Sequence, residues 1–360
     1  MMDELQSAAE LPPQYLSALT SINLQPLWPS LRALVPHGDP TRRSVPVHWR
    51  YSEVRELLMQ AGDLTPIEKA ERRVLVLCNP GLGIDNLQAT PSIYVGLQLI
   101  LPGEDAPNHR HSPSAIRLIV EGEGGFTTVE GERLPMEPGD LILTPSGLWH
   151  EHGHTGTEPV IWLDALDLPL IYYLETSQAE EAPLQHAPEH PDSSQTKFRR
   201  AGLLPYDQLH DHNPYPMLRY PWKETREALT ELAGAADRDA LIQLAYINPV
   251  TGEECLPILG FSALMLRPGE CAELGRRTCS AVIHAVEGQG SAEIDGVSFD
   301  WERHDTLAVP PHAPGLLQNG SGTRPAFYLS WTMPLCIGSC GFTASMPKRG
   351  HFLLKIDRFR

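Results

Sequence analysis

Two spaced motifs constrain the fold of this chain more than any other feature. Each begins with a glycine and ends on histidine, and they read Gly103-x5-His109-x-His111 and Gly139-x5-Pro145-x-Gly147-x2-His150. Side chains alternate between the two faces of a strand, so His109 and His111 point the same way and can bind one ion. His150, on another strand, then completes one face of an octahedron. The motifs predict a metal site built on the strands of a small β-barrel.

The predicted ligand set restricts the metal. Three neutral imidazoles suit Fe, Zn, Cu or Ni better than Mg or Ca. A facial set of three ligands also leaves open coordination positions for a substrate and dioxygen. The site is therefore interpreted as catalytic and not structural.

Composition excludes several classes of function. The chain has 360 residues, enough for two domains, and its 45 acidic and 28 basic side chains give a net charge of -17. Without a basic patch, nucleic acid and anionic membrane surfaces are not expected as partners. No apolar stretch is long enough to span a membrane, and no export signal precedes the first helix. The six scattered cysteines favour a reducing cytoplasm over a disulfide scaffold.

The first half of the chain predicts a helical arm, residues 1–70, followed by a barrel, residues 71–178. Helical spacing covers Tyr15–Leu34 and Ser52–Ala61, and a capping box of Thr65, Pro66 and Glu68 predicts a third short helix. Alternation and apolar runs then predict strands, separated by Gly, Pro and Asp turns, at Arg73–Leu77, Tyr94–Leu101, Ala115–Glu121, Leu141–Pro145 and Val160–Ala165.

The second half repeats the first without its histidines. Residues 179–240 are predicted to form a linker and a helical connection, with an exposed stretch at Glu180–Gln195 and a helix near Lys223–Ala235. A second strand-rich block, residues 241–335, follows, and a C-terminal tail covers 336–360. In this block the three ligand positions hold Gly275, Arg277 and Gly315. It is predicted to be a folded barrel without a metal site of this kind; a degenerate site using His284 and His312 is the alternative to buried structural histidines.

The two motifs, in this order and separation, resemble the cupin superfamily. They depart from it in two places: the usual glutamate ligand is replaced by Ala115 and Ile116, and His154 stands where asparagine is usual. A mainly β bicupin, with two double-stranded β-helix (jelly-roll) barrels, an N-terminal helical arm and no glutamate ligand, resembles the gentisate 1,2-dioxygenase family. This family includes relatives acting on salicylate and 1-hydroxy-2-naphthoate. The resemblance covers roughly Leu24 to Trp331, for example AERRVLVLCNPGLG from Ala70 and GDLILTPSGLWHEHG from Gly139.

The resemblance implies ring cleavage of an aromatic hydroxy-acid by Fe(II) and dioxygen. Gentisate cleaved to maleylpyruvate is the first expectation, and salicylate and 1-hydroxy-2-naphthoate are the alternatives. Neutral ligands leave the iron its full double positive charge, which suits a substrate binding through carboxylate and phenolate oxygens. Since the second barrel has lost its ligands, one Fe(II) per chain is expected in the first barrel. The resemblance also implies a homotetramer.

Several arginines and histidines are candidate substrate residues. Arg117 shares the parity of the ligands and is interpreted as a charge partner of the substrate carboxylate, with a surface arginine as the alternative. The resemblance also assigns a substrate contact to Arg73, with Arg72 expected to face solvent. His152 shares the parity of His150 and, by resemblance, binds or deprotonates a substrate hydroxyl. For His154 a structural role is preferred.

The remaining candidates line one predicted face. Asp164 lies among apolar residues, needs a partner and by resemblance belongs to the pocket, together with Trp162 on its face. Tyr94, Gly96 and Gln98 share a face of another strand, where the glycine leaves room for a flat ring; a bulge or close packing at Gly96 is the alternative. The sequence is open to other interpretations: a non-catalytic small-molecule-binding bicupin, or a Zn or Mn isomerase or hydrolase. His210, Asp211 and His212 are interpreted as a chance ligand pair, and Cys336 with Cys340 as an improbable metal pair.

Overall fold

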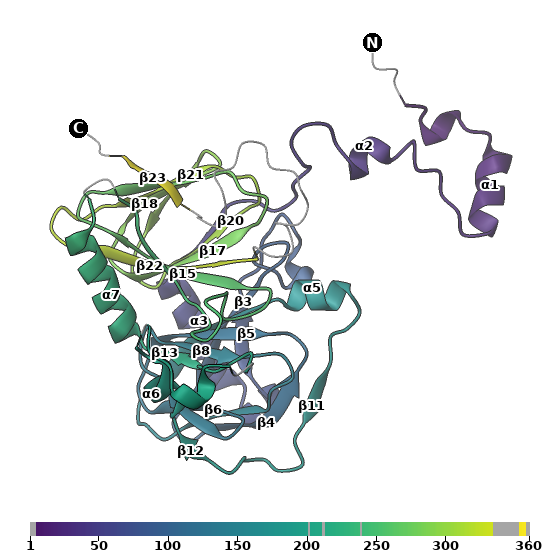
Figure 1. Cartoon of the computed structure of the whole chain (residues 1–360). Helices are drawn as coiled ribbons and strands as arrows, with labels where there is room; N and C mark the ends of the chain where they lie inside the picture. The colour runs from purple at the N-terminus through teal and green to yellow at the C-terminus, as the bar shows by residue number, and fades with distance from the viewer. Residues whose placement is uncertain (1–4, 201, 211–212, 238–239, 334–352, 358–360) are drawn as a thin grey trace. The chain divides into compact units, whose positions relative to one another are not determined.

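The computed structural model describes residues 5–200, 202–210, 213–237, 240–333 and 353–357. Its residues fall into two compact units, Met1–Arg43 and Ser44–Arg360. Strands predominate over helices, as the sequence predicts, and the second unit holds both barrels (Figure 1). None of the described helices is long and apolar enough to cross a membrane.

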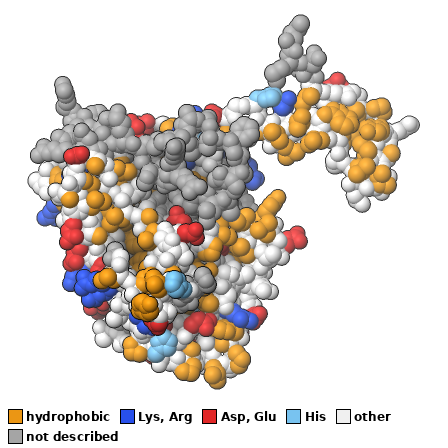
Figure 2. Space-filling view, viewed as in Figure 1, with side chains coloured by type: hydrophobic (Ala, Val, Ile, Leu, Met, Phe, Trp, Pro, Cys, Tyr) orange, Lys and Arg blue, Asp and Glu red, His pale blue; other side chains and the backbone are white. Residues whose placement is uncertain are grey.

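The first unit is helical, and Leu11 is the only buried hydrophobic side chain among its described residues. It contains η1 (Ala8–Glu10), α1 (Pro13–Ser21) and α2 (Leu31–Leu34). The predicted single helical run over Tyr15–Leu34 is wrong between α1 and α2, because Asn23 has a positive φ of 59° and two prolines follow it. Apolar side chains gather on the surface of this unit (Figure 2); they include Leu5, Ile22, Leu24, Leu27, Leu34 and Val35.

Two sheets packed face to face form the first barrel. One has the order β13-β8-β5-β10-β3-β2, and the other β11-β4-β9-β6-β7-β12. The strands are β2 (Arg73–Val76), β3 (Tyr94–Ile100), β4 (Asp105–His111), β5 (Ala115–Glu121), β6 (Gly125–Val129), β7 (Glu132–Pro135), β8 (Leu141–Thr144), β9 (His150–His154), β10 (Val160–Leu166), β11 (Ala179–Glu181), β12 (His190–Pro191) and β13 (Arg219–Tyr220). The five strands predicted in this region are all present.

The second barrel repeats this order, with its second sheet written in the reverse direction, except that β12 has no counterpart among the described residues. Its sheets run β1-β20-β17-β22-β15-β14 and β19-β18-β21-β16-β23. The strands are β1 (Val47–Trp49), β14 (Ile242–Ala245), β15 (Gly260–Leu266), β16 (Cys271–Leu274), β17 (Ala281–Glu287), β18 (Gly290–Ile294), β19 (Val297–Trp301), β20 (Thr306–Val309), β21 (Gly315–Asn319), β22 (Ala326–Thr332) and β23 (Leu353–Asp357). Strand β21 begins at Gly315 as β9 begins at His150, which supports the predicted match between these two positions.

Two strand–helix segments connect the barrels: in each, the helix packs on one barrel and the short strand before it pairs within the other. Helix α3 (Tyr51–Leu64) packs against β2 and β3 of the first barrel, whereas β1, just before it, pairs with β20 of the second. Helix α7 (Trp222–Ala235) packs against β14 and β15 of the second barrel, whereas β13, just before it, pairs with β8 of the first. The repeat therefore starts at β1 and at β13, earlier than the predicted boundaries at 71 and 241.

One aspartate in each barrel caps the helix that packs on the other. Asp305 Oδ1 accepts the Tyr51 amide at the start of α3 at 2.8 Å, and Asp140 Oδ1 accepts the Trp222 amide at the start of α7 at 2.8 Å. The second carboxylate oxygen of each binds a cation-forming side chain three residues before the capped one: His48 at 2.8 Å and Arg219 at 2.7 Å. A carboxylate at a helix N-terminus satisfies free amides and complements the helix dipole.

Removing the Asp305 carboxylate should destabilise the whole second unit. Burial raises the pKa of Asp305, but the hydrogen bonds from His48 and from the Tyr51 and Glu302 amides outweigh it and lower the pKa. A depressed folded-state pKa means that the stabilisation is complete above the unfolded value, near 3.8, and is lost as the pH falls through the folded value. Asp305→Asn should therefore cost about 1–2 kcal/mol at pH 7.

Urea unfolding of wild type and Asp305→Asn, followed by circular dichroism at pH 7 and pH 3, measures this effect. The difference between the two proteins should shrink at pH 3. Asp300→Asn, on an exposed strand position of the same barrel, is the matched control and should leave the midpoint unchanged. Equal midpoints for Asp305→Asn and wild type at pH 7 would show that the cap contributes nothing.

Two short predicted segments differ in the structure. Helix α4 (Ile67–Ala70) begins after Pro66, which has no side-chain acceptor, so the predicted capping box is wrong. The predicted linker also contributes β11 and β12 to the edges of the first barrel. This segment is therefore part of the barrel wall. The short helices not yet named are η2 (Ile84–Asn86), α5 (Leu168–Tyr173), α6 (Ser194–Phe198) and η3 (Tyr206–Gln208).

Candidate metal centre

Strands β4 and β9 bring four histidines together inside the first barrel. His109 lies directly opposite His150 in the antiparallel pair, just after a bulge that begins at Ala106. The ring centroids of His109 and His150 are 4.2 Å apart, those of His111 and His150 4.7 Å, and those of His109 and His111 5.8 Å. His152 is farther away, 5.6 Å from His150 and 6.0 Å from His109.

Three of these rings are held by backbone carbonyls through the same nitrogen. The Nδ1 atoms of His109, His111 and His150 donate to the carbonyls of Pro107, Pro113 and Leu148, at 2.7, 2.7 and 3.0 Å. A ring that donates from Nδ1 in its neutral form has its lone pair on Nε2. The buried Nε2 of His109 has no hydrogen-bond partner, as expected for an atom that binds a metal ion. The residues present therefore fit a metal.

Burial keeps the cluster neutral. It lowers the pKa of His109 to about 3, with a further contribution from Arg72, and it also lowers the pKa of His111. It lowers the pKa of His150 and His152 well below the usual value. Neutral imidazole is the form that binds metals, so these rings need lose no proton at neutral pH.

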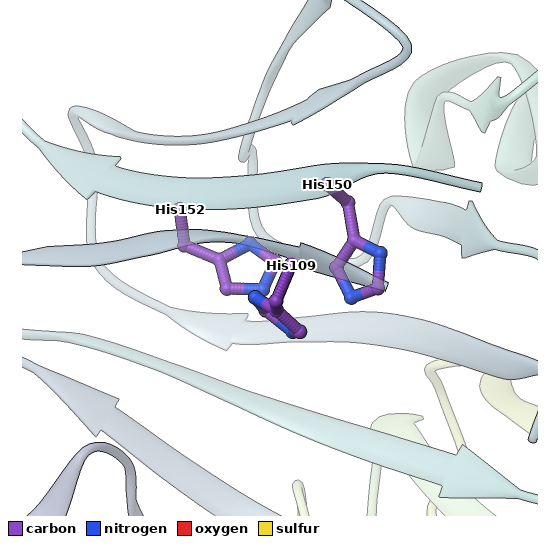
Figure 3. A group of neighbouring side chains, drawn as sticks. All are labelled: His109, His150 and His152. Atoms are coloured by element: carbon purple, nitrogen blue, oxygen red, sulfur yellow. The ribbon is translucent and has the colours of Figure 1, made fainter. Parts of the chain in front are cut away.

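The ring centroids place His111 nearer than His152 to both His109 and His150, but the distances between ligating atoms select a different triad. The histidines whose ligating atoms all lie within 4.8 Å of one another are His109, His150 and His152 (Figure 3), which puts His152 in place of the predicted His111. Hydrogen bonding favours His111, because His152 Nδ1 lies 2.7 Å from a guanidinium nitrogen of Arg117 and must accept from it. Neutral His152 then carries its proton on Nε2 and has no lone pair left for a metal.

A buried salt bridge holds Arg117 on the inner face of the barrel. Its Nε and Nη2 donate to the two oxygens of Asp164 at 3.0 and 3.2 Å, and Asp164 also accepts from the Trp162 indole at 2.9 Å. Arg117 is only 3% exposed, which excludes the surface-arginine alternative. This salt bridge uses the two guanidinium nitrogens, Nε and Nη2, that would otherwise bind a substrate carboxylate. Arg117, the predicted partner of that carboxylate, is therefore already paired within the protein.

The other predicted wall residues lie in register on the same face. Gln98 is opposite Trp162, Gly96 is opposite Asp164, and Tyr94 is opposite Leu166. A side chain added at Gly96 would meet the Tyr94 hydroxyl at 2.7 Å and Val74 at 2.6 Å. The flat ring that the glycine accommodates is thus that of Tyr94, two residues away, and a larger residue at 96 would displace it.

The predicted roles of the two adjacent arginines must be exchanged. Arg73 points away from the histidines: it forms a buried salt bridge with Glu104 and lies beside Gly62 of α3. Arg72 is half-buried and interacts electrostatically with Asp164 and Tyr94, and burial lowers its pKa. Arg72 and His109 also line one small cavity of about 150 Å³. The prediction that Arg73 faces the site and Arg72 faces solvent is wrong.

Two further buried histidines, His154 and His284, form hydrogen bonds within the protein. His154 Nε2 donates to the Glu158 carbonyl at 2.5 Å, and its Nδ1 accepts the Gly156 amide at 3.1 Å, in line with the structural role preferred for it. His284 is buried with its Nδ1 3.0 Å from the Thr306 hydroxyl. Among the described residues no metal-binding group forms in the second barrel, so the alternative of a site using His284 and His312 has no support.

Some sequence candidates lie outside this site. Asp211 and His212, and Cys336 and Cys340, lie outside the described residues. A wider cavity of about 590 Å³ borders α6 and α7 and includes Phe198, Met217, Tyr220 and Tyr246. It has no histidine or cysteine in its wall, so despite its size it is not where the predicted chemistry would occur.

Comparison with known proteins identifies the family. A cupin domain model matches residues 96–166. A gentisate 1,2-dioxygenase of Ralstonia sp is 49% identical over 91% of this chain and 92% of its own length. The chain belongs to the gentisate 1,2-dioxygenase family. A 5-aminosalicylate 1,2-dioxygenase of Comamonas sp is 36% identical over 80% of this chain and 78% of its own length.

Solved structures agree with this assignment. The salicylate 1,2-dioxygenase of Pseudoaminobacter salicylatoxidans in an adduct with gentisate is 30% identical, with a TM-score of 0.84 over 93% of this chain and 94% of that one. This member of the gentisate 1,2-dioxygenase family is thus a bicupin ring-cleaving dioxygenase. A non-catalytic bicupin and an isomerase or hydrolase are thereby set aside.

Proposed function

We propose that this chain is an Fe(II)-dependent dioxygenase that cleaves gentisate to maleylpyruvate between the carboxyl-bearing and hydroxyl-bearing ring carbons. The observation that carries the proposal is the set of Nε2 lone pairs on His109, His111 and His150. Each ring is neutral and fixed through Nδ1. In the part of the chain that the structure describes, no carboxylate joins the cluster.

A ligand set without charge favours an anionic substrate. Fe(II) held by three imidazoles keeps its double positive charge, and a carboxylate with a neighbouring phenolate oxygen neutralises it. Iron, when bound, would conduct electrons from the aromatic ring to dioxygen, whose two atoms both enter the product. A ligand carboxylate would reduce the charge available to the substrate, which is the physical reason that Ala115 and Ile116 suit this reaction.

The protein's own side chains position the substrate. Arg72, half-buried beside the cluster, is the guanidinium available for the substrate carboxylate. His152, with its proton on Nε2, donates to a substrate oxygen. Tyr94, Gln98 and Trp162 form the wall against which the ring would lie, and Arg117 neutralises the buried charge of Asp164.

Oxygen uptake tests the proposal. Protein loaded anaerobically with Fe(II) and mixed with gentisate in air should consume one dioxygen per gentisate and give a ring-opened product absorbing in the near ultraviolet. Salicylate, 5-aminosalicylate and 1-hydroxy-2-naphthoate complete the substrate panel, because all present a carboxylate beside a ring hydroxyl. Absence of oxygen uptake with every member of the panel, by protein with bound iron, would refute the proposal.

Two further properties belong to the same proposal. The second barrel has Gly315 where the first has His150, so metal analysis should give one iron per chain, and two would contradict it. A homotetramer is proposed from the family, and native mass spectrometry or light scattering measures it directly.

A further inference from the structure

A buried threonine completes the hydrogen bonding around His152. Thr127, on β6, lies directly opposite His152 on β9 and is fully buried. Its hydroxyl accepts from Arg117 Nη1 at 2.7 Å and lies 3.2 Å from His152 Nδ1. Arg117 Nη1 therefore has both of its hydrogens in use, one on His152 and one on Thr127.

These contacts determine which nitrogen of His152 carries the proton. Arginine stays protonated in proteins and can only donate, so Nδ1 of His152 accepts. The Thr127 oxygen already accepts from Arg117, which leaves its hydrogen to be directed at the same Nδ1. Two donors thus converge on one lone pair, and the neutral ring must carry its hydrogen on Nε2.

The proton position matters because His152 lies close enough to be a ligand. Its ligating atom is within 4.8 Å of those of His109 and His150. A fourth imidazole on the metal would take a coordination position that the substrate or dioxygen needs. An Nε2–H group has no lone pair to give, so the hydrogen bonds to Nδ1 keep that position open.

We propose that Thr127 is a positioning residue that, together with Arg117, locks His152 in its Nε2–H form and so keeps it a hydrogen-bond donor and not a fourth metal ligand. The inference rests on the proposed function for its catalytic consequence. The tautomer of His152 can be tested independently of the proposed function, because the position of the proton is measured on metal-free protein.

Thr127→Val removes the hydroxyl at nearly constant shape. Thr127 also accepts the second Nη1 hydrogen of Arg117 and so holds that nitrogen against His152 Nδ1, and Thr127→Val removes both this acceptor and the hydroxyl donor. Long-range ¹H–¹⁵N spectra of the metal-free protein, with the His152 signals assigned by comparison with His152→Gln, should therefore show a single Nε2–H tautomer in wild type and a mixture in Thr127→Val. Visible absorption of the Co(II)-loaded protein should change in Thr127→Val, as an added imidazole changes the coordination. Where ring cleavage is measured, kcat/KM should fall about tenfold at unchanged iron content.

The neighbouring residue supplies a matched control. Thr128 is equally buried and its hydroxyl has no hydrogen-bond partner, so Thr128→Val should match wild type in all three measurements. Thr127→Ser should restore the wild-type tautomer and Co(II) spectrum. A wild-type tautomer and spectrum in Thr127→Val, or the same change in Thr128→Val, would overturn the inference. Absence of ring-cleaving activity in wild type would refute the proposed function alone.

Discussion

His111→Ala should lose its iron and all measurable ring cleavage. Four protein ligands give a structural zinc site about 10–16 kcal/mol, so one ligand accounts for about 2.5–4 kcal/mol, or ~10²- to 10³-fold in metal affinity. His111 donates its Nδ1 hydrogen to the Pro113 carbonyl and has its Nε2 lone pair free. Iron per chain after gel filtration, together with oxygen uptake, measures the loss.

His152→Ala is the decisive companion variant. It removes the histidine whose ligating atom lies within 4.8 Å of those of His109 and His150, but which accepts from Arg117 and has no free lone pair. We expect it to keep its iron and to lose activity through the missing donor. Iron loss in His152→Ala with retention in His111→Ala would show that the closest triad is the ligand set after all.

Arg72→Met should reduce kcat/KM for an aromatic hydroxy-acid about a hundredfold, chiefly through KM. A charged hydrogen bond in a partly buried site contributes about 3 kcal/mol, and methionine keeps the apolar stem while removing the charge. Arg72 is the cation that lowers the pKa of His109 and His111 after burial itself, so it lies near the cluster. Steady-state oxygen uptake over a range of gentisate concentrations measures the effect.

Arg73→Met separates a substrate role from a structural one. Its guanidinium is buried against Glu104, so its loss leaves a carboxylate without its partner and should lower the unfolding midpoint, with KM unchanged. Arg72→Met should show the opposite pattern: an unchanged midpoint and a raised KM. A raised KM in Arg73→Met alone would restore the sequence-based assignment.

The sequence correctly predicted the features that depend on the alternation of side chains between the two faces of a strand. His109, His111 and His150 share the parity of one face, and the strands that carry them occur where the motifs place them. Arg117 and Asp164 follow the same rule, and they lie opposite each other on neighbouring strands. Parity within a strand is a local property, so one sequence is enough to determine it.

Features that depend on neighbouring strands were missed. Arg72 precedes the first residue of β2, where the sequence holds two arginines and only the pairing of Arg73 with Leu99 determines which side each faces. Thr127 has no motif: its role follows from its position opposite His152 on a strand far along the chain. The strands β1 and β13 are only 3 and 2 residues long, too short to give an alternation signal.

The reciprocal capping of α3 and α7 also orders the folding of the chain in time. Helix α3 and strand β1 are near the N-terminus, yet they need Asp305 and the strand β20 that follows it. During synthesis the first barrel and its histidines therefore emerge long before the residues that hold α3 behind β2 and β3. The second barrel would then be a late-arriving partner in folding, and the histidine cluster of the first barrel would reach its final support only when nearly the entire chain has been made.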